Sequence, residues 1–229
     1  EGGFGRREVV IRVNGLDTPW GADDLAAVAG SDAHAVLVPK TASPADIARY
    51  DARLASAPAT LRLWTMIETC ACVAQLDAIA AMAHTTRLGA FVMGTNDLAK
   101  EMRARLTPDR TPFLAFLSLA VAAARAHGLA ILDGVCNEFR DLAVFRRETE
   151  QGRIFGFDGK TLIHPDQIAP CNEVFSPGEE ELHHARAVIA AFALPENAGR
   201  GVIRVDGRMV ERLHLEQAQH LMAVAAQIA

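Results

Sequence analysis

Apolar and polar positions alternate along the chain in two rhythms. Short runs rich in Val, Ile, Leu and Phe are followed by longer alanine-rich segments whose apolar residues recur at helical spacing. This order is typical of parallel strands joined by crossover helices. It predicts six strands, at residues 9–13, 35–38, 62–67, 88–93, 129–133 and 154–157.

The length of the chain and the number of strands indicate the fold class. A chain of 229 residues can bury one large core, and α/β barrels commonly form a single domain of this size. Because a closed (β/α)8 barrel, or TIM barrel, needs eight strands, six strands leave two sheet edges open. We therefore expect a barrel catalytic domain over residues 1–194, with two further strand–helix units preceding Glu1 in the natural protein.

The last part of the chain has a different pattern. Two short apolar runs, 202–205 and 208–210, flank Asp206-Gly207, which predicts a hairpin with a two-residue turn. An amphipathic helix is expected from residue 212 to the end. Residues 195–229 are therefore expected to form a hairpin and helix that pack on a neighbouring subunit.

Several helix ends are marked by residues that cap helices. Ser43-Pro44 and Thr111-Pro112 each place a capping side chain before a proline at the first helical position. Residues 176–179, Ser-Pro-Gly-Glu, fit a capping box. His127-Gly128 predicts a helix end closed by a glycine in the left-handed conformation.

The composition limits the classes of partner. The formal net charge of −5 argues against a broad positive surface for nucleic acid or for an anionic membrane. The four cysteines have neither the paired spacing of a zinc site nor the density of a disulfide scaffold. No apolar run reaches the roughly 18 residues that span a bilayer, and the first residues do not resemble a signal peptide. We expect a reduced, soluble, cytoplasmic protein.

Two carboxylates follow neighbouring apolar runs. Glu68 comes directly after a run expected to be buried on both faces, and Asp97 stands just past the next run. Since parallel α/β folds carry their reactive groups at the carboxyl ends of strands, these two side chains are expected to meet. Two carboxylates with waters and substrate oxygens form a typical magnesium site. The alternative is that Asp97 caps a helix starting at Leu98 and that Glu68 pairs with an arginine.

Three residues at other strand ends are candidate substrate ligands. Arg12 could hold a substrate carboxylate through two parallel hydrogen bonds, or make a plain surface ion pair. Lys40 could form a Schiff base, although lysine at such a position more often binds phosphate or pairs with an acid. His164 lies in the segment 159–165 after the last strand, where barrels often bind phosphate, and a structural turn is the alternative.

Taken in order, these segments resemble the HpcH/HpaI aldolase and citrate lyase beta-subunit-like family over essentially the whole chain. The resemblance rests on six motifs in the same order: Val10-Ile11-Arg12-Val13-Asn14, Val38-Pro39-Lys40, Met66-Ile67-Glu68-Thr69, Gly94-Thr95-Asn96-Asp97-Leu98, Asp133-Gly134-Val135 and Gly156-Phe157-Asp158-Gly159-Lys160-Thr161-Leu162-Ile163-His164-Pro165.

This resemblance implies a magnesium-dependent carbon–carbon lyase, with Mn²⁺ as an alternative ion. Its substrates would be coenzyme A thioesters such as malyl-CoA, citramalyl-CoA or citryl-CoA, and it would assemble as a homotrimer. The resemblance makes Glu68 and Asp97 the metal ligands and gives Arg12 the oxo-acid part of the substrate. The candidate substrate and coenzyme A ligands are then Arg12, Lys40, Lys160, His164 and Pro165.

The sequence departs from the family pattern at two places. The family's acidic Asp-Leu-Glu-Asp-like motif, which supports the metal, is absent from this sequence. The carboxy-terminal hairpin of many relatives reads Gly-Lys-Met-Val-Asp-Arg-Pro, and its Asp reaches the active site of a neighbouring subunit. Here residues 207–213 read Gly-Arg-Met-Val-Glu-Arg-Leu, so Glu211 stands in that place. Asp206 is a nearby substitute, although its turn position explains it better.

The mechanism implied by the resemblance is an aldol or Claisen-type reaction. The metal would bind an oxo acid such as glyoxylate, oxaloacetate or pyruvate and polarise its carbonyl. Glu211 from a neighbouring subunit would remove a proton from acetyl-CoA to give an enolate. The alternatives are a metal-dependent pyruvate aldolase that uses no coenzyme A, and a weakly catalytic subunit of a citrate lyase complex.

Overall fold

The computed structural model describes residues 4–228, which form two compact units. The first unit ends at Cys171 and the second begins at Asn172. The division falls inside one helix, α8 (Ile168–Phe175). Each unit is described by itself below.

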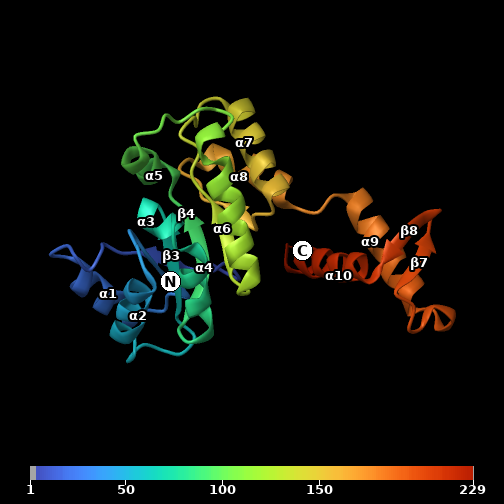
Figure 1. Ribbon diagram of the computed structural model, residues 1–229, viewed down its shortest axis with the longest axis horizontal. Helices are drawn as coiled ribbons and strands as arrows, with labels where there is room; N and C mark the ends of the chain where they lie inside the picture. The colour runs from blue at the N-terminus through green and yellow to red at the C-terminus, as the bar shows by residue number, and fades with distance from the viewer. Residues whose placement is uncertain (1–3, 229) are drawn as a thin grey trace. The chain divides into compact units, whose positions relative to one another are not determined.

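A six-stranded parallel sheet forms the centre of the first unit (Figure 1). Its strands follow one another in chain order, and each pairs in parallel with the next. They are β1 (Val10–Arg12), β2 (Ala35–Val38), β3 (Arg62–Ile67), β4 (Leu88–Met93), β5 (Ala130–Asp133) and β6 (Gly159–Lys160). The predicted α/β class with a parallel sheet is confirmed.

The predicted sixth strand at residues 154–157 is wrong. Those residues lie at the end of helix α7 (Leu142–Phe155), which Gly156 closes with a φ of 91°. Ile154 is 84% exposed, so its side chain faces solvent instead of a sheet. The strand that pairs with β5 is Gly159–Lys160. A short apolar run does not by itself distinguish the end of a helix from a strand.

Helices alternate with the strands, as the sequence predicts. Besides α7 and α8, the first unit contains α1 (Gly21–Ala29), α2 (Pro44–Arg53), α3 (Cys70–Val73), α4 (Leu76–Ala80), α5 (Thr95–Met102), α6 (Leu114–Ala126) and the 3-10 helices η1 (Ala81–His84), η2 (Thr111–Phe113) and η3 (Pro165–Gln167). Helices α2, α4 and α6 contact one another in series, and α2 and α6 pack on strands β3 to β5 (Figure 1). Within residues 4–228, no helix combines the length and hydrophobicity that a bilayer crossing requires.

Local sequence explains where two of these helices begin or end. Ser43 precedes α2 and Pro44 occupies its first position, as predicted. Asp46 Oδ2 accepts the Ser43 N–H at 3.0 Å, which satisfies a backbone donor at the helix start. Helix α6 ends at Ala126, and Gly128 has a φ of 70°, which confirms the predicted left-handed glycine.

Two predicted helix starts are displaced. Thr111-Pro112 opens the 3-10 turn η2, and α6 begins only at Leu114. Helix α9 (Glu179–Ala193) is preceded by Gly178, whose N–H donates to Glu181 Oε2 at 2.8 Å. The capping carboxylate therefore lies two residues later than a box starting at Ser176 would require.

The core of the first unit determines where polar groups emerge. Strand β4 is buried at almost every residue, so both of its faces are covered. Phe91 from this strand and Phe113 and Phe145 from the helical layer are fully buried. Each such side chain stabilises the fold by about 1.5–3 kcal/mol. Because polar groups are costly inside this core, buried charges need partners, and Glu68 and Asp133 lie where β3 and β5 end.

The second unit contains α9, η4 (Pro195–Asn197), a hairpin of β7 (Val202–Val205) and β8 (Arg208–Glu211), and α10 (Arg212–Ile228). Asp206 and Gly207 have φ values of 49° and 77°, as a tight two-residue hairpin turn requires. The predicted hairpin and helix are therefore present. The division of the chain lies earlier than the predicted boundary at residue 194, because α9 packs on α10 and shares its core, which consists of Ala185, Val188, Ile203, Val205, Val210 and Ala218.

Candidate functional site

Two carboxylates leave neighbouring strands and face the same pocket. Glu68 directly follows β3, and Asp97 is the third residue of α5, which begins shortly after β4. Strands β3 and β4 stay paired as far as Ile67 and Met93, so both connections leave the sheet at one level. The pocket is lined by Lys40, Glu68, Thr69, Asp97, Lys100 and Glu101. The structure thus brings the two predicted metal ligands together.

Lys40 connects the two carboxylates. Its backbone N–H donates to Glu68 Oε1 at 2.8 Å, and its Nζ lies 3.3 Å from Asp97 Oδ1. Its φ of 52° is a left-handed conformation that costs a residue with a side chain on the order of 1–3 kcal/mol. Of the alternatives for Lys40, pairing with an acid is the one that the structure contains.

Glu68 carries a charge in an unfavourable place. The residue is 3% exposed, and burial raises the pKa of its carboxyl above the ordinary value. The Lys40 N–H lowers that pKa, whereas the negative charge of Asp97 raises it. Among the described residues only Lys40 donates a hydrogen bond to this carboxylate, so Oε2 keeps its lone pairs free. A buried carboxylate beside a second negative charge gains most from binding a cation.

The structure does not contain the alternative arrangements of these two residues. Helix α5 begins at Thr95, so Asp97 lies inside its first turn and does not cap a helix that starts at Leu98. A carboxylate there still interacts favourably with the positive end of the helix dipole. No arginine of residues 4–228 forms an ion pair with Glu68.

Arg12 interacts electrostatically with Glu68. It is the last residue of β1 and is exposed, and its positive charge lowers the pKa of Glu68. In the described part of the chain it has no ion-pair partner. Its guanidinium is therefore available to a substrate carboxylate, the role for which the sequence singled it out.

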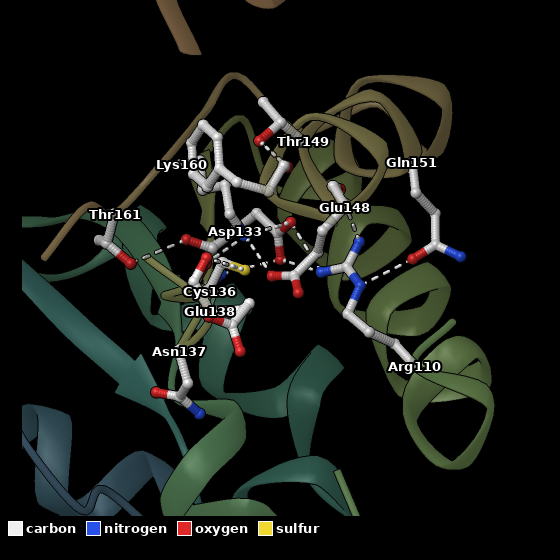
Figure 2. A network of polar contacts seen from close by, with 12 residues as sticks. Arg110, Asp133, Cys136, Asn137, Glu138, Glu148, Thr149, Gln151, Lys160 and Thr161 are labelled. Atoms are coloured by element: carbon white, nitrogen blue, oxygen red, sulfur yellow. Dashed lines mark hydrogen bonds and ion pairs between the residues drawn. The ribbon is translucent and has the colours of Figure 1, made fainter. Parts of the chain in front are cut away.

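A buried ionic network lies at the end of the next strand (Figure 2). Asp133 ends β5 and is fully buried, and both of its carboxylate oxygens lie 2.7 Å from Arg110 Nη1. Lys160 Nζ lies 3.2 Å from Asp133 Oδ2 and 2.7 Å from Glu148 Oε1. The positive charges of Arg110 and Lys160 thus balance the negative charges of Asp133 and Glu148. No role was predicted for Arg110 or Glu148 from the sequence.

Lys160 is occupied inside this network. Its side chain is 0% exposed, and its Nζ also donates to the Gly134 carbonyl oxygen at 2.5 Å. The predicted contact with coenzyme A would require this ammonium to leave three internal partners. The structure therefore places Lys160 among the residues that support the site and not among those that face a ligand.

His164 and Pro165 follow β6 in the chain and are more exposed than Lys160. His164 Nδ1 accepts the Asp166 N–H at 3.3 Å, which opens the 3-10 turn η3. The His164 ring stacks on Phe139 with centroids 5.2 Å apart and planes at 21°. The structural turn expected as the alternative is therefore present, and Pro165 is exposed beside it.

Glu211 belongs to the second unit. It ends β8, and its N–H donates to His214 Nδ1 at 2.9 Å, at the start of α10. Asp206 occupies the first turn position of the hairpin, which is the turn role that the sequence favoured for it. The assignment of Glu211 as acid or base in a neighbouring subunit stays a prediction.

The pocket suits a hard divalent cation with few protein ligands. Both predicted ligands are carboxylates, and Mg²⁺ usually keeps several waters while binding one or two carboxylates. The described residues hold no group of three or more histidine, cysteine, aspartate or glutamate side chains arranged for a metal ion. Glu68 and Asp97 would therefore hold such an ion together with water and substrate oxygens.

Two curated relatives resemble most of this chain. Residues 4–165 match the HpcH/HpaI aldolase/citrate lyase family. The (3S)-malyl-CoA thioesterase of Cereibacter sphaeroides ATCC 17025 is 49% identical over 226 residues, which cover 99% of this chain and 77% of that protein. The L-malyl-CoA/beta-methylmalyl-CoA lyase of Cereibacter sphaeroides ATCC 17029 is 31% identical, over 98% of this chain and 78% of that protein.

A solved structure resembles the chain as well. The CitE protein of Mycobacterium tuberculosis, in complex with magnesium, acetoacetate and coenzyme A, matches with a TM-score of 0.74 and 27% identity, over 95% of this chain and 78% of that chain. The parallel sheet is accordingly a curled half-barrel of the TIM-barrel-like citrate lyase type. The chain belongs to the HpcH/HpaI aldolase/citrate lyase family of enzymes.

Proposed function

We propose that Glu68 and Asp97 hold Mg²⁺ or Mn²⁺ and that the chain acts on a 3-hydroxyacyl-CoA thioester of the malyl-CoA type. One observation carries this proposal: two carboxylates from neighbouring strands face one pocket, and burial makes the charge of Glu68 unfavourable without a cation. The substrate class is supported by the names of the two relatives, and the metal and coenzyme A by the CitE complex.

The reaction that this site supports best is cleavage or formation of a carbon–carbon bond. A bound metal would polarise the carbonyl of the oxo acid as a Lewis acid. Arg12 would bind the carboxylate of the same oxo acid with its planar guanidinium. In cleavage a base takes the hydroxyl proton, the carbon–carbon bond breaks, and the acetyl-CoA enolate takes a proton at carbon; we assign the acid–base role to Glu211 of a neighbouring subunit.

Thioester hydrolysis is the second candidate, because the (3S)-malyl-CoA thioesterase has the higher identity over 99% of this chain. In that reaction water attacks the thioester carbonyl, the carbon–sulfur bond breaks, and free coenzyme A and a hydroxy acid are released. Arg12 and the two carboxylates would bind the hydroxy-acid end of the substrate in the same way. The two reactions therefore share a binding site and differ in the bond that breaks.

Product analysis distinguishes the two reactions. The purified chain is incubated with (3S)-malyl-CoA and Mg²⁺, and the products are separated by liquid chromatography with mass spectrometry. Glyoxylate with acetyl-CoA supports carbon–carbon cleavage, and malate with free coenzyme A supports hydrolysis. Absence of both product pairs would contradict the proposed substrate class.

Substitution of the ligands tests the metal site. Glu68→Gln and Asp97→Asn each remove one ligand charge without changing the size of the side chain. Each should abolish turnover and binding of Mn²⁺ while the protein stays folded. Glu101→Gln is the matched control, because Glu101 lines the same pocket without being a predicted ligand.

We also propose a homotrimer, which light scattering after gel filtration would test.

A further inference from the structure

We propose that Lys160, Asp133 and Gln167 are positioning residues that fix the loop of residues 134–137, and that this loop fixes the helix start that carries Asp97. The inference rests on the proposed function only in taking Asp97 as a metal ligand. These three residues are buried, and none of them lines the pocket. The inference assigns them a defined part in the activity.

The first contact holds both backbone groups of Gly134. Asp133 Oδ1 accepts the Gly134 N–H at 2.8 Å, and Lys160 Nζ donates to the Gly134 carbonyl oxygen at 2.5 Å. An ideal Cβ on Gly134 would lie 3.0 Å from the Met93 carbonyl oxygen and 3.1 Å from Thr95 Oγ1. The loop therefore passes tightly over the connection between β4 and α5, and a Cβ at this position would press on both neighbours.

The second contact holds Cys136 in the same loop. Gln167 is fully buried, and its Nε2 donates to the Cys136 carbonyl oxygen at 3.2 Å. Gln167 Oε1 accepts the Ile163 N–H at 3.0 Å, which fixes the orientation of the amide. Buried side chains thus hold three backbone groups between residues 134 and 136.

The loop reaches Asp97 through a pair of amides. Asn137 Nδ2 donates to Asn96 Oδ1 at 2.7 Å, and Asn96 Nδ2 donates to Asn137 Oδ1 at 3.0 Å. Asn96 is the residue before Asp97 in the first turn of α5. The amide pair therefore joins the loop to the residue that precedes Asp97.

Charge balance alone does not explain this arrangement. Replacing a buried ion pair with apolar residues is often neutral or stabilising, so such pairs are weak evidence for stability. The charges of Arg110 and Lys160 together neutralise Asp133 and Glu148, and this balance does not require the contact of Lys160 with the Gly134 carbonyl oxygen, which adds a fixed geometry. That contact points to a positioning role, because residues that orient metal ligands typically change metal affinity by 10–100-fold when they are replaced.

A double variant separates positioning from charge balance. Lys160→Met leaves one buried negative charge without a partner and should lower the melting temperature. Adding Glu148→Gln restores neutrality without restoring the bond to Gly134, so the melting temperature should recover. We expect both variants, and the uncharged change Gln167→Met, to bind Mn²⁺ about tenfold more weakly than the native chain.

A loop reporter and a control complete the experiment. Cys136 is 2% exposed, so its labelling by a thiol reagent, located by peptide mapping, should become faster in all three variants. Arg87→Met removes a partly buried ion pair with Asp51 at the other end of β4, and it should lower the melting temperature without changing Mn²⁺ affinity or Cys136 labelling.

The outcomes are decisive for each proposal separately. Native Mn²⁺ affinity and a protected Cys136 in both the double variant and Gln167→Met would overturn the positioning role. A native chain that binds no Mn²⁺ would instead refute the metal site, and Cys136 labelling would still decide whether these residues fix the loop. If Lys160→Met does not fold, the Gln167→Met variant decides the question by itself.

Discussion

Gly94→Ala tests the placement of Glu68 without changing a charge or a ligand. Gly94 precedes α5 with a φ of −115°, so its backbone conformation does not itself require glycine. An ideal Cβ at this position would lie 2.5 Å from Glu68 Cβ and 2.7 Å from Glu68 Oε2. A side chain at this position would therefore displace Glu68, which leaves the neighbouring strand β3.

The size of the effect follows from these two distances. Carbon atoms in contact normally lie about 3.5–4.0 Å apart, so the Glu68 side chain would have to move by roughly 1 Å or more. Overpacking of this kind costs about 1–3 kcal/mol of stability. A displacement of about 1 Å in a catalytic site can lower the rate by about a hundredfold. We therefore expect a folded variant with weakened Mn²⁺ binding and a turnover lower by about two orders of magnitude.

The assay compares Mn²⁺ affinity, turnover of malyl-CoA and melting temperature. Gly89→Ala is the control on the same strand. The atom nearest to the added Cβ would be Arg62 Nε at 3.0 Å, which lies near the end of a flexible side chain and can move away. The control should keep native metal affinity and rate. A folded Gly94→Ala variant with native affinity and native rate would refute the idea that the position of Glu68 determines metal binding.

Three further predictions follow from the geometry. Without metal, Glu68→Gln should melt at a higher temperature than the native chain at pH 8. The pKa of Glu68 is raised in the folded state, so its contribution to stability is present below the unfolded pKa and is lost as the pH rises through the folded pKa. The difference in melting temperature should therefore vanish at low pH, and equal melting at pH 8 would contradict the prediction. A thiol reagent at pH 8 should label Cys70 before Cys72 and Cys136. Burial raises the pKa of all three thiols, to about 12 for Cys72 and about 11 for Cys136, but of the three only Cys70 is partly exposed; equal rates by peptide mapping would speak against this. Lys40→Gly should keep Mn²⁺ binding, because the hydrogen bond to Glu68 comes from the Lys40 backbone. It should shift the free energy of unfolding by less than about 1 kcal/mol, because glycine adopts positive φ freely. Loss of Mn²⁺ binding would show that the Lys40 ammonium is needed.

The fold was predictable where local pattern and tertiary structure agree. Strands β2, β3 and β4 coincide with the predicted runs because each is apolar and ends in a clear polar group. The hairpin was marked by Asp206-Gly207, two residues that tolerate positive φ. Strand β6 was missed because Gly159-Lys160 has no apolar period. It pairs with β5 at the point where Lys160 neutralises Asp133, a contact that only the folded chain reveals.

The carboxylates of the candidate site were predictable from the sequence, but the basic partner of Asp133 was not. Glu68 and Asp97 could be found as polar residues that follow buried runs, and Asp133 is the polar residue that ends the predicted run 129–133. Its partner could not be chosen, because any of 23 basic residues could supply the charge. Arg110 comes from the loop after α5, far from any predicted strand end, and reaches Asp133 only through tertiary structure.

Glu211 allows a test of whether a complete site needs two chains. If Glu68 and Glu211 of one site come from different subunits, Glu68→Gln and Glu211→Gln should each be inactive, and mixed oligomers of the two should recover activity. Random assembly of equal amounts leaves about a quarter of the sites with both native residues, so activity should rise to about a quarter of the native value.

The matched control mixes Glu68→Gln with Asp97→Asn. These residues line one pocket of a single chain, so no mixed oligomer can contain an intact pair and no recovery is expected. Should Glu211 act within its own chain, the first mixture would also stay inactive, since every site would carry one defect. Recovery in the first mixture and none in the second is the pattern that only a site shared between subunits produces.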